Sequence, residues 1–153
     1  MSPIDWDLAW NAGGKIALAY LLALPTGWMR ERQGHGIGLR TFPIVAMASC
    51  GYLLTLHPHA GEDALAANSR VLQGLVAGIG FIGGGAILKQ GMNVYGTATA
   101  ASIWNTGAIG ASCAMGSYEI AVILGILNVV TMQALVPLKR KLDRQARKSL
   151  ESE

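Results

Sequence analysis

Five apolar runs alternate with short polar segments along this chain. The runs cover Ile16 to Met29, Thr41 to Leu56, Val71 to Leu88, Ala98 to Met115 and Ile120 to Leu138. Crossing about 30 Å of hydrocarbon at 1.5 Å per residue takes roughly 20 residues, with about 17 as the lower limit. The pattern therefore predicts an all-α protein with about five transmembrane helices, although Pro25 interrupts the first and short run.

The third and fourth runs are rich in glycine and are separated by a short polar turn, Lys89 to Asn93. Residues 71–112 thus predict a membrane hairpin. Glycines four residues apart let membrane helices approach closely, because lipid provides no hydrophobic force that drives helices together. The alternative is that the triplet Gly83-Gly84-Gly85 breaks the helix and exposes backbone carbonyls to a ligand. The glycines with a candidate role in packing or in a break are Gly78, Gly80, Gly83, Gly84, Gly85 and Gly107.

Composition agrees with a membrane protein. Of the 153 residues, 52% are hydrophobic and 14% are charged, and the mean hydropathy is +0.38. A soluble domain carries about 25% charged residues, and a chain of this length forms one domain. We expect a single transmembrane domain over residues 1–138 and a basic cytoplasmic tail over residues 139–153. Leu135, Leu138 and Leu142 share one helical face across the end of the last span and the start of the tail, which predicts a helix that continues the span.

The distribution of Lys and Arg predicts the orientation, because cytoplasmic loops carry an excess of these residues. With the N-terminus outside, the cytoplasmic segments hold 10 of the 12 basic residues, and only Lys15 and Arg70 lie elsewhere. The outer segments instead carry Asp5, Asp7, Glu62, Asp63 and Glu119. The C-terminus is therefore predicted to be cytoplasmic. The acidic N-terminus argues against a cleaved secretory signal.

The candidate functional residues gather at the predicted cytoplasmic ends of the helices. They are Glu31, Arg32, Gln33, Arg40, Thr41, Gly96 and Thr99. Arg32 and Arg40, with the N-terminus of the fourth helix, suit an anion such as a lipid phosphate, a nucleotide phosphate or an acidic patch on a partner. The alternative is that these arginines only follow the positive-inside rule and contact headgroups. We expect Glu31 to be a counter-ion for Arg32 or Arg40, and Arg40 to lock the first, second and fourth helices together.

Other polar residues allow two readings each. Asn105 and Asn128 lie within predicted spans, where interhelical hydrogen bonds are the default and a polar conduit is the alternative. His57, Glu62 and Asp63 belong to one outer loop, which is either a solvated loop or a divalent-cation sensor. Cys50 and Cys113 have no neighbours at metal-ligand spacing and are expected to be small buried hydrophobic residues.

The motifs resemble those of the MgtC/SapB family of bacterial inner-membrane proteins. The resemblance rests on Glu31-Arg32-Gln33, on Gly38-Leu39-Arg40-Thr41, on Gly78 through Ile87, and on Gly96 through Trp104 followed by Ala108-Ile109-Gly110. Four blocks in this order cover residues 15 to about 115. The chain departs from the family pattern at Tyr95-Gly96-Thr97-Ala98-Thr99, where the family has Arg-Gly-Leu-Thr-Thr, and at Pro25 and Ile37. Many members continue into an ACT-like cytoplasmic domain, and we expect this chain to be a short form that lacks it.

The resemblance implies a multi-pass plasma-membrane protein linked to growth at low magnesium and, in pathogens, to survival inside host cells. We expect a regulatory or adaptor role, exerted at the cytoplasmic cluster on a membrane protein or lipid. The alternative is a channel or transporter for magnesium or another small solute, with its pathway at a subunit interface. Magnesium prefers carboxylate oxygens and water, and the predicted spans contain no Asp or Glu.

Several function classes are not indicated. The sequence has no Ser/His/Asp or Cys/His constellation, no zinc spacing and no phosphate loop, so we expect neither an enzyme nor a bound cofactor or metal. The basic tail lacks aromatic residues and directly follows a membrane helix, which favours lipid headgroups over nucleic acid as its partner. Few, glycine-rich helices favour a homo-oligomer, most simply a two-fold dimer.

Overall fold

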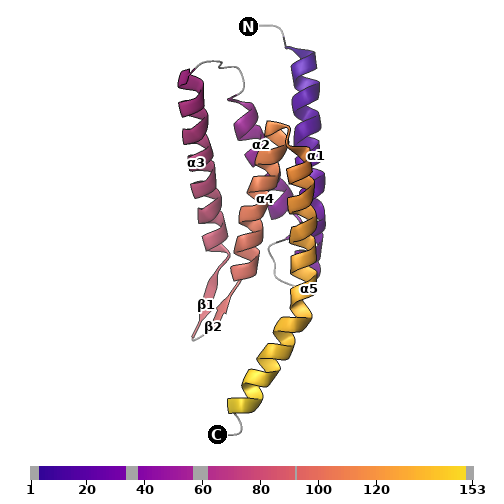
Figure 1. The fold of residues 1–153 in the computed structure, drawn as a ribbon, viewed down its shortest axis with the longest axis vertical. Helices are drawn as coiled ribbons and strands as arrows, with labels where there is room; N and C mark the ends of the chain where they lie inside the picture. Colours follow the sequence, from indigo (N-terminus) through magenta and orange to yellow (C-terminus); the bar gives the residue numbers. More distant parts are fainter. Residues whose placement is uncertain (1–3, 34–37, 57–61, 92, 151–153) are drawn as a thin grey trace.

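Each predicted apolar run corresponds to one helix of the structure, a computed structural model that describes residues 4–33, 38–56, 62–91 and 93–150. Side chains are described for these residues except 62–65, 93 and 136–150. The helices are α1 (Trp6–Arg32), α2 (Thr41–Leu54), α3 (Glu62–Gly85), α4 (Thr97–Met115) and α5 (Tyr118–Leu150). The predicted all-α class is confirmed, and the described helices run roughly side by side as a bundle (Figure 1).

A small β-hairpin joins α3 to α4 where the sequence indicated only a polar turn. Its strands are β1 (Leu88–Gln90) and β2 (Asn93–Tyr95), which pair antiparallel with Leu88 opposite Tyr95. Gly91 in the connection has a φ of +60°, which glycine adopts without steric cost. Strands of three residues are too short for an alternating pattern to stand out in the sequence.

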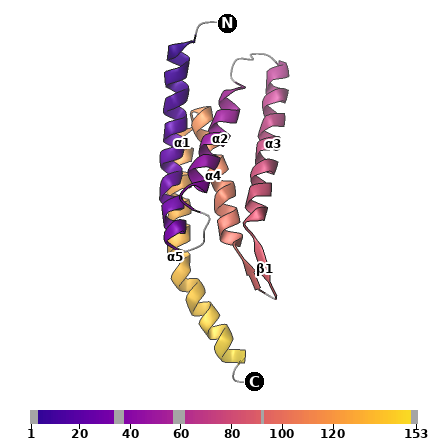
Figure 2. The ribbon, with the colours of Figure 1, turned by 180° about the vertical axis from the view of Figure 1, so that it is seen from behind.

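Helix α4 occupies the centre of the bundle and packs against α1, α2, α3 and α5. The two opposite views of the ribbon show α1, α2 and α5 gathered around it and α3 standing to one side (Figures 1 and 2). Helix α3 contacts α4 more extensively than it contacts α2. The core thus lies between α1, α2, α4 and α5, and α3 forms the edge of the bundle.

Small residues on α4 make this central position possible. A side chain at Gly110 would collide with the carbonyl oxygen of Ala46 on α2. Close approach of backbones through small residues is the usual mode of helix association in membranes. Cys50 and Cys113 are free and buried in this core, as predicted.

The start of α1 follows a familiar capping rule. The Asp5 side chain accepts hydrogen bonds from the backbone N–H groups of Asp7 and Leu8, both at 3.1 Å, and so caps α1. Helix α1 continues through Pro25, the residue that interrupts its apolar run in the sequence. Helix α5 continues without interruption to Leu150, so the predicted helical tail is confirmed (Figure 1).

One helix segment among the described residues, Tyr118–Leu135 of α5, is long and apolar enough on its own to cross a membrane. Helix α2 is also apolar but has 14 residues. The number of helices therefore agrees with the sequence analysis, whereas the crossing of the membrane by each of the five remains a prediction.

Replacing Gly110 with alanine should separate α2 from α4. The new methyl group would meet the Ala46 backbone, which has no rotamer to change, so we expect Gly110→Ala to lower the free energy of unfolding by about 1–3 kcal/mol. Gly51→Ala on α2, where a methyl group meets nothing within 4 Å, is the matched control and should leave stability unchanged or raise it. Unfolding in mixed detergent micelles, followed by circular dichroism, measures both. Equal stability of the two variants would contradict the packing described here.

Candidate functional site

The last turns of α1 direct polar side chains toward α4. Thr26, Arg30 and Gln33 are spaced by four and three residues, which places them on one face of the helix. Thr26 is fully buried, and Arg30 is only 5% exposed. The guanidinium of Arg30 donates from Nη1 to Gln33 Oε1 at 2.9 Å and from Nη2 to Thr99 Oγ1 on α4. A charged side chain therefore connects two helices from inside the bundle.

The Nε atom of Arg30 is buried and has no hydrogen-bond partner. Among the described residues, no carboxylate forms an ion pair with this guanidinium. A buried charge is costly unless it is paired and hydrogen-bonded. Arg30 is thus the least satisfied polar group in the described core.

Gly96 fixes the start of α4 next to this guanidinium. It is the N-cap residue and has a φ of +85°, and a side chain there would collide with the carbonyl oxygen of Ala86. Only glycine fits, so the N-cap provides no side chain to accept hydrogen bonds from the first turn. The first bond of α4 runs from the N–H of Ala100 to the carbonyl of Gly96 at 2.9 Å. Thr99, which precedes Ala100 in this first turn, is 2% exposed.

Glu31 stabilises the connection between α1 and α2. Its Oε2 accepts a hydrogen bond from the backbone N–H of Leu39 at 3.2 Å. A side chain at Gly38 would lie 2.7 Å from the N atom of Glu31 and 2.8 Å from the carbonyl of Gly27. The expected role of Glu31 as a counter-ion for Arg32 or Arg40 is therefore replaced by a backbone contact, made possible by two glycines that let the segments touch.

The predicted site residues Arg32 and Arg40 lie on the surface. The guanidinium of Arg32 sits 5.2 Å from the centroid of the Trp28 ring, a cation–π arrangement on the exposed side of α1. Arg40 is exposed at the N-cap of α2, and Thr41 is half-buried at its first residue. Arg40 is exposed, and the described bond from α1 to α4 is made by Arg30, so the expectation that Arg40 locks the first, second and fourth helices together stays a prediction.

Sequence reasoning overlooked Arg30, although a signal was present. Trp28 and Arg32 are four residues apart and share one face, while Thr26, Arg30 and Gln33 share another. The first face carries the tryptophan typical of a membrane interface, and the second carries polar residues that need partners. This contrast identifies Arg30 as the arginine that points inward.

Further along the bundle, polar side chains bond to one another between helices. Ser102 on α4 donates to Asn128 Oδ1 on α5 at 2.7 Å, and Asn128 Nδ2 donates to Thr26 Oγ1 on α1 at 3.4 Å. Asn105 Nδ2 donates to the carbonyl of Leu124 at 3.3 Å. Both predicted asparagines thus make the interhelical hydrogen bonds that were the default expectation.

The predicted packing glycines fall into two groups. Gly83 lies against the backbone of Ala100, and Gly107 lies against the side chain of Ile79. The other four face open space in the described chain: Gly78, Gly80, Gly84 and Gly85. Helix α3 ends at Gly85, before the predicted run ends at Leu88, so the triplet forms the last turn of the helix and does not interrupt it. The carbonyls of Gly83 and Gly84 accept bonds from Ala86 and Ile87.

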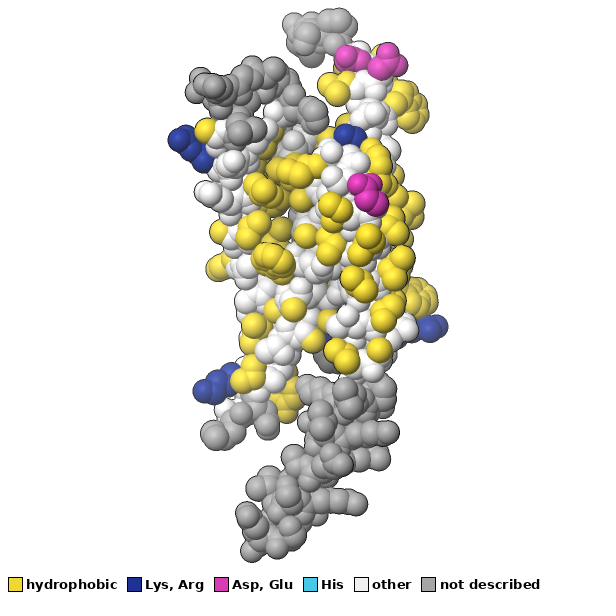
Figure 3. Space-filling model, in the orientation of Figure 1, with side chains coloured by type: hydrophobic (Ala, Val, Ile, Leu, Met, Phe, Trp, Pro, Cys, Tyr) yellow, Lys and Arg dark blue, Asp and Glu magenta, His cyan; other side chains and the backbone are white. Residues whose placement is uncertain are grey.

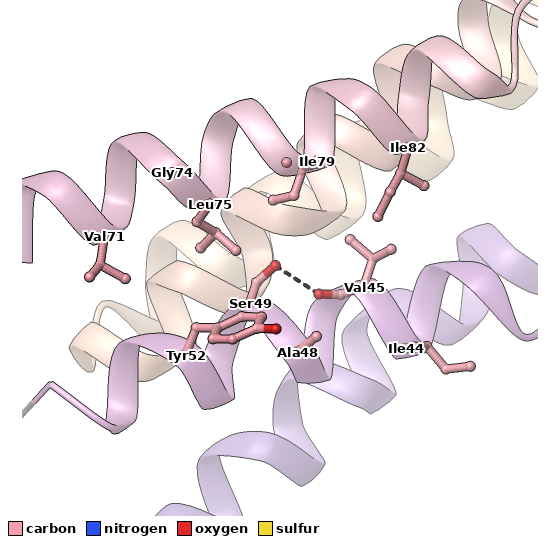
Figure 4. A pocket seen from close by; sticks show the side chains of 11 residues that line it. Ile44, Val45, Ala48, Ser49, Tyr52, Val71, Gly74, Leu75, Ile79 and Ile82 are labelled. Carbon is pink, nitrogen blue, oxygen red and sulfur yellow. Dashed lines mark hydrogen bonds between the residues drawn. The ribbon is translucent and has the colours of Figure 1, made fainter.

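An apolar groove separates α2 from α3 (Figure 4). Its volume is about 500 Å³, and Val45, Ala48 and Ile79 are among its lining residues. Ser49 lies in the groove but donates its hydroxyl to the carbonyl of Val45 at 2.7 Å (Figure 4). The groove offers hydrophobic contact and no free cluster of polar groups.

The proposed outer cation sensor lies outside the described part of the chain, because residues 57–61 and the side chains of Glu62 and Asp63 are not described. Within the part that is described, no group of three or more His, Cys, Asp or Glu side chains is placed to hold a metal ion.

These features define a helical bundle with a buried polar seam and a cationic end. The chain belongs to the MgtC family, whose model matches residues 16–141. It is 34% identical to Protein SrpB of Synechococcus elongatus over 137 residues, which are 82% of this chain and 75% of SrpB. No solved structure matches the chain.

Two further relatives are longer than this chain. Protein MgtC of Brucella abortus is 31% identical over 141 residues, covering 92% of this chain and 58% of that protein. "Putative magnesium transporter YhiD" of Escherichia coli (strain K12) is 31% identical over 128 residues, covering 78% of this chain and 58% of YhiD. The chain thus spans little more than half the length of these two relatives.

The bond between Ser102 and Asn128 should be measurable as an energetic coupling. In a double-mutant cycle of Ser102→Ala and Asn128→Ala, we expect a coupling free energy of about 0.5–1.5 kcal/mol, typical of hydrogen bonds between membrane helices. Ser49→Ala combined with Asn128→Ala is the control, because Ser49 bonds only its own helix, and its effect should add within about 0.5 kcal/mol. Additive effects in the Ser102 cycle would contradict the bond.

Proposed function

We propose that this member of the MgtC family is a multi-pass protein of the bacterial inner membrane with a regulatory or adaptor role in magnesium-limitation or stress physiology. In this proposal the protein acts through its cytoplasmic end on a membrane partner or on lipid, and it is not an enzyme.

The surface of the bundle supports a membrane environment. Large hydrophobic side chains are exposed along the helices, including Phe81 at 84%, Ile126 at 58% and Trp104 at 52% exposed. Figure 3 shows hydrophobic side chains spread over the middle of the molecule, with most charged ones near its two ends. A soluble monomer rarely exposes contiguous apolar surface of this extent. Lipid would remove these side chains from water.

The charges support a cytoplasmic location for the end that contains Arg30. Arg30, Arg32, Arg40 and Lys89 lie at this end, where the sequence also places the basic tail. Acidic side chains lie toward the opposite end of the view in Figure 3, where α1 begins. This asymmetry is the one that the positive-inside rule associates with the cytoplasm.

The hydrogen bonding of the interior polar groups helps to distinguish regulation from transport. Apart from Arg30, whose Nε has no partner, the described buried polar side chains between α1, α4 and α5 have partners within the bundle, as Ser102, Asn128 and Thr26 illustrate. Groups that satisfy one another hold helices together and do not need an ion or substrate. This observation favours a regulator whose exposed end makes the functional contacts.

Magnesium transport is the second candidate, and the name of the relative YhiD favours it. A pathway for magnesium would need oxygen ligands, preferably carboxylates, and the apolar runs of this chain contain none. The lack of carboxylates argues against a pathway through one protomer, whereas a pathway at a subunit interface would not run through one protomer alone. The two-fold dimer remains a proposal as well, which the open glycines Gly78 and Gly84 on α3 support.

Magnesium flux separates these two functions. Purified protein in proteoliposomes that enclose a magnesium-sensitive dye should give no more magnesium entry than protein-free liposomes. The same chain should restore growth at low magnesium to a bacterium that lacks its own MgtC-family gene. Magnesium entry that requires the protein would replace the regulatory proposal with transport.

The exposed arginines at the cytoplasmic end should matter for growth more than for folding. We expect Arg40→Glu to abolish growth rescue at low magnesium, because the substitution reverses the charge at the contact surface. It should not lower the amount of folded protein, because Arg40 is exposed. Arg70→Glu, an exposed arginine on α3 that lies away from this end, is the matched control and should rescue growth. Full rescue by Arg40→Glu would refute the role of this surface.

A further inference from the structure

We propose that a phosphate group binds between the Arg30 guanidinium and the first turn of α4. The proposal deepens the function proposed above and rests on it for the cytoplasmic location of the site. It replaces Arg32 and Arg40, the arginines that the sequence suggested for an anion, with one that the sequence analysis did not select.

The Arg30 guanidinium is buried and incompletely hydrogen-bonded. Arg30 is 5% exposed, and its Nε is buried without a partner. Two of its five donor hydrogens are used, by Gln33 and Thr99. Both acceptors are neutral, so they satisfy hydrogen bonds and leave the charge uncompensated. A buried arginine normally has an anion beside it.

The charge of Arg30 lies at the start of α4. The bond to Thr99 places the guanidinium beside the first turn of α4, a helix of 19 residues. A helix N-terminus carries a partial positive charge, and its first N–H groups lack acceptors within the helix. The N-cap Gly96 provides no side-chain acceptor. The charge of the guanidinium and the partial positive charge of the helix N-terminus therefore lie close together, and an anion bound to both would stabilise both.

The acidic residues of the chain determine whether Arg30 has an internal counter-ion. The chain has nine acidic residues. Five lie in the segments predicted to be outside, and a sixth, Glu31, accepts from the backbone of Leu39. The other three, Asp143, Glu151 and Glu153, belong by sequence to the basic tail, and their side chains lie outside the described part of the chain. The described bundle thus provides no internal counter-ion, which favours an external anion.

The geometry fits phosphate. Thr97 and Ala98 in the first turn of α4 are exposed, so an anion can approach from solvent or from the headgroup layer, while Arg30 reaches it from within the bundle. A phosphate group offers several oxygens and can accept from backbone N–H groups and from a guanidinium at the same time. Both a lipid headgroup and a soluble phosphate provide this chemistry, and the experiment distinguishes them.

The test measures thermal unfolding of the purified full chain in a non-ionic detergent free of phosphate. Sodium phosphate is added at constant ionic strength against sodium acetate, and phosphatidylglycerol is added in a separate arm. We expect phosphate or phosphatidylglycerol to raise the unfolding midpoint by roughly 3–6 °C at tenfold its dissociation constant. A rise with free phosphate identifies a soluble ligand, and a rise with the lipid alone identifies a headgroup.

Arg30→Gln should abolish this rise, and without phosphate it should unfold no earlier than the native chain, because it removes an uncompensated buried charge. Lys89→Gln, which removes an exposed cation in the hairpin at the same end, should retain the rise. If Arg30→Gln does not fold, Arg30→Lys takes its place and should bind more weakly, because lysine lacks the planar fork.

Three results would overturn the site: no rise in either arm, an equal rise with acetate, or an equal rise in the Arg30 variant and the native chain. These results do not depend on magnesium flux or growth rescue. If phosphate binds and the protein also conducts magnesium, the site stands and the regulatory role fails. If nothing binds and growth is still rescued without flux, the regulatory role stands and the site fails.

Discussion

The position of α4 against all four other helices is the constraint on which this structure depends. A helix in that position can carry only narrow side chains where neighbouring backbones touch it, and Gly110 against Ala46 shows how little room remains. The same crowding buries hydroxyl groups on α4, which need hydrogen-bond partners, and two of them have partners on other helices. Ser102 finds Asn128, and Thr99 finds Arg30. Small residues thus determine the packing, and the polar side chains between them align α1, α4 and α5.

Hydrophobic run length was sufficient to predict the five helices, because apolar helices of this length differ strongly from the polar segments that join them. It was not sufficient to predict the hairpin at Leu88–Gln90 and Asn93–Tyr95, since two three-residue strands leave no periodic pattern. The glycine triplet misled for a related reason. Glycine lowers helix stability wherever it stands, so the sequence cannot distinguish a break inside a helix from its end at Gly85.

The candidate site was predicted as a region but not as a set of contacts. The sequence brought the ends of α1, α2 and α4 together, and Gly96 and Thr99 do lie near Arg30. Which arginine points inward depends on the rotation of α1 about its axis. That rotation is set by packing against α4, about 70 residues further along the chain. Arg32 is four residues from Trp28 and belongs to the outer face, whereas Arg30 follows Thr26 on the inner face.

A buried cation at the start of the central helix is the central claim of this account, and hydrogen exchange of arginine side chains tests it directly. In protein labelled with ¹⁵N-arginine, the Nε–H resonances of Arg30 and Arg40 are assigned by their absence from the spectra of Arg30→Gln and Arg40→Gln. The Nε–H of Arg30 should exchange with water at least about tenfold more slowly than the Nε–H of Arg40. Equal exchange rates for the two resonances would mean that Arg30 is exposed to water, and would contradict the burial on which the account is built.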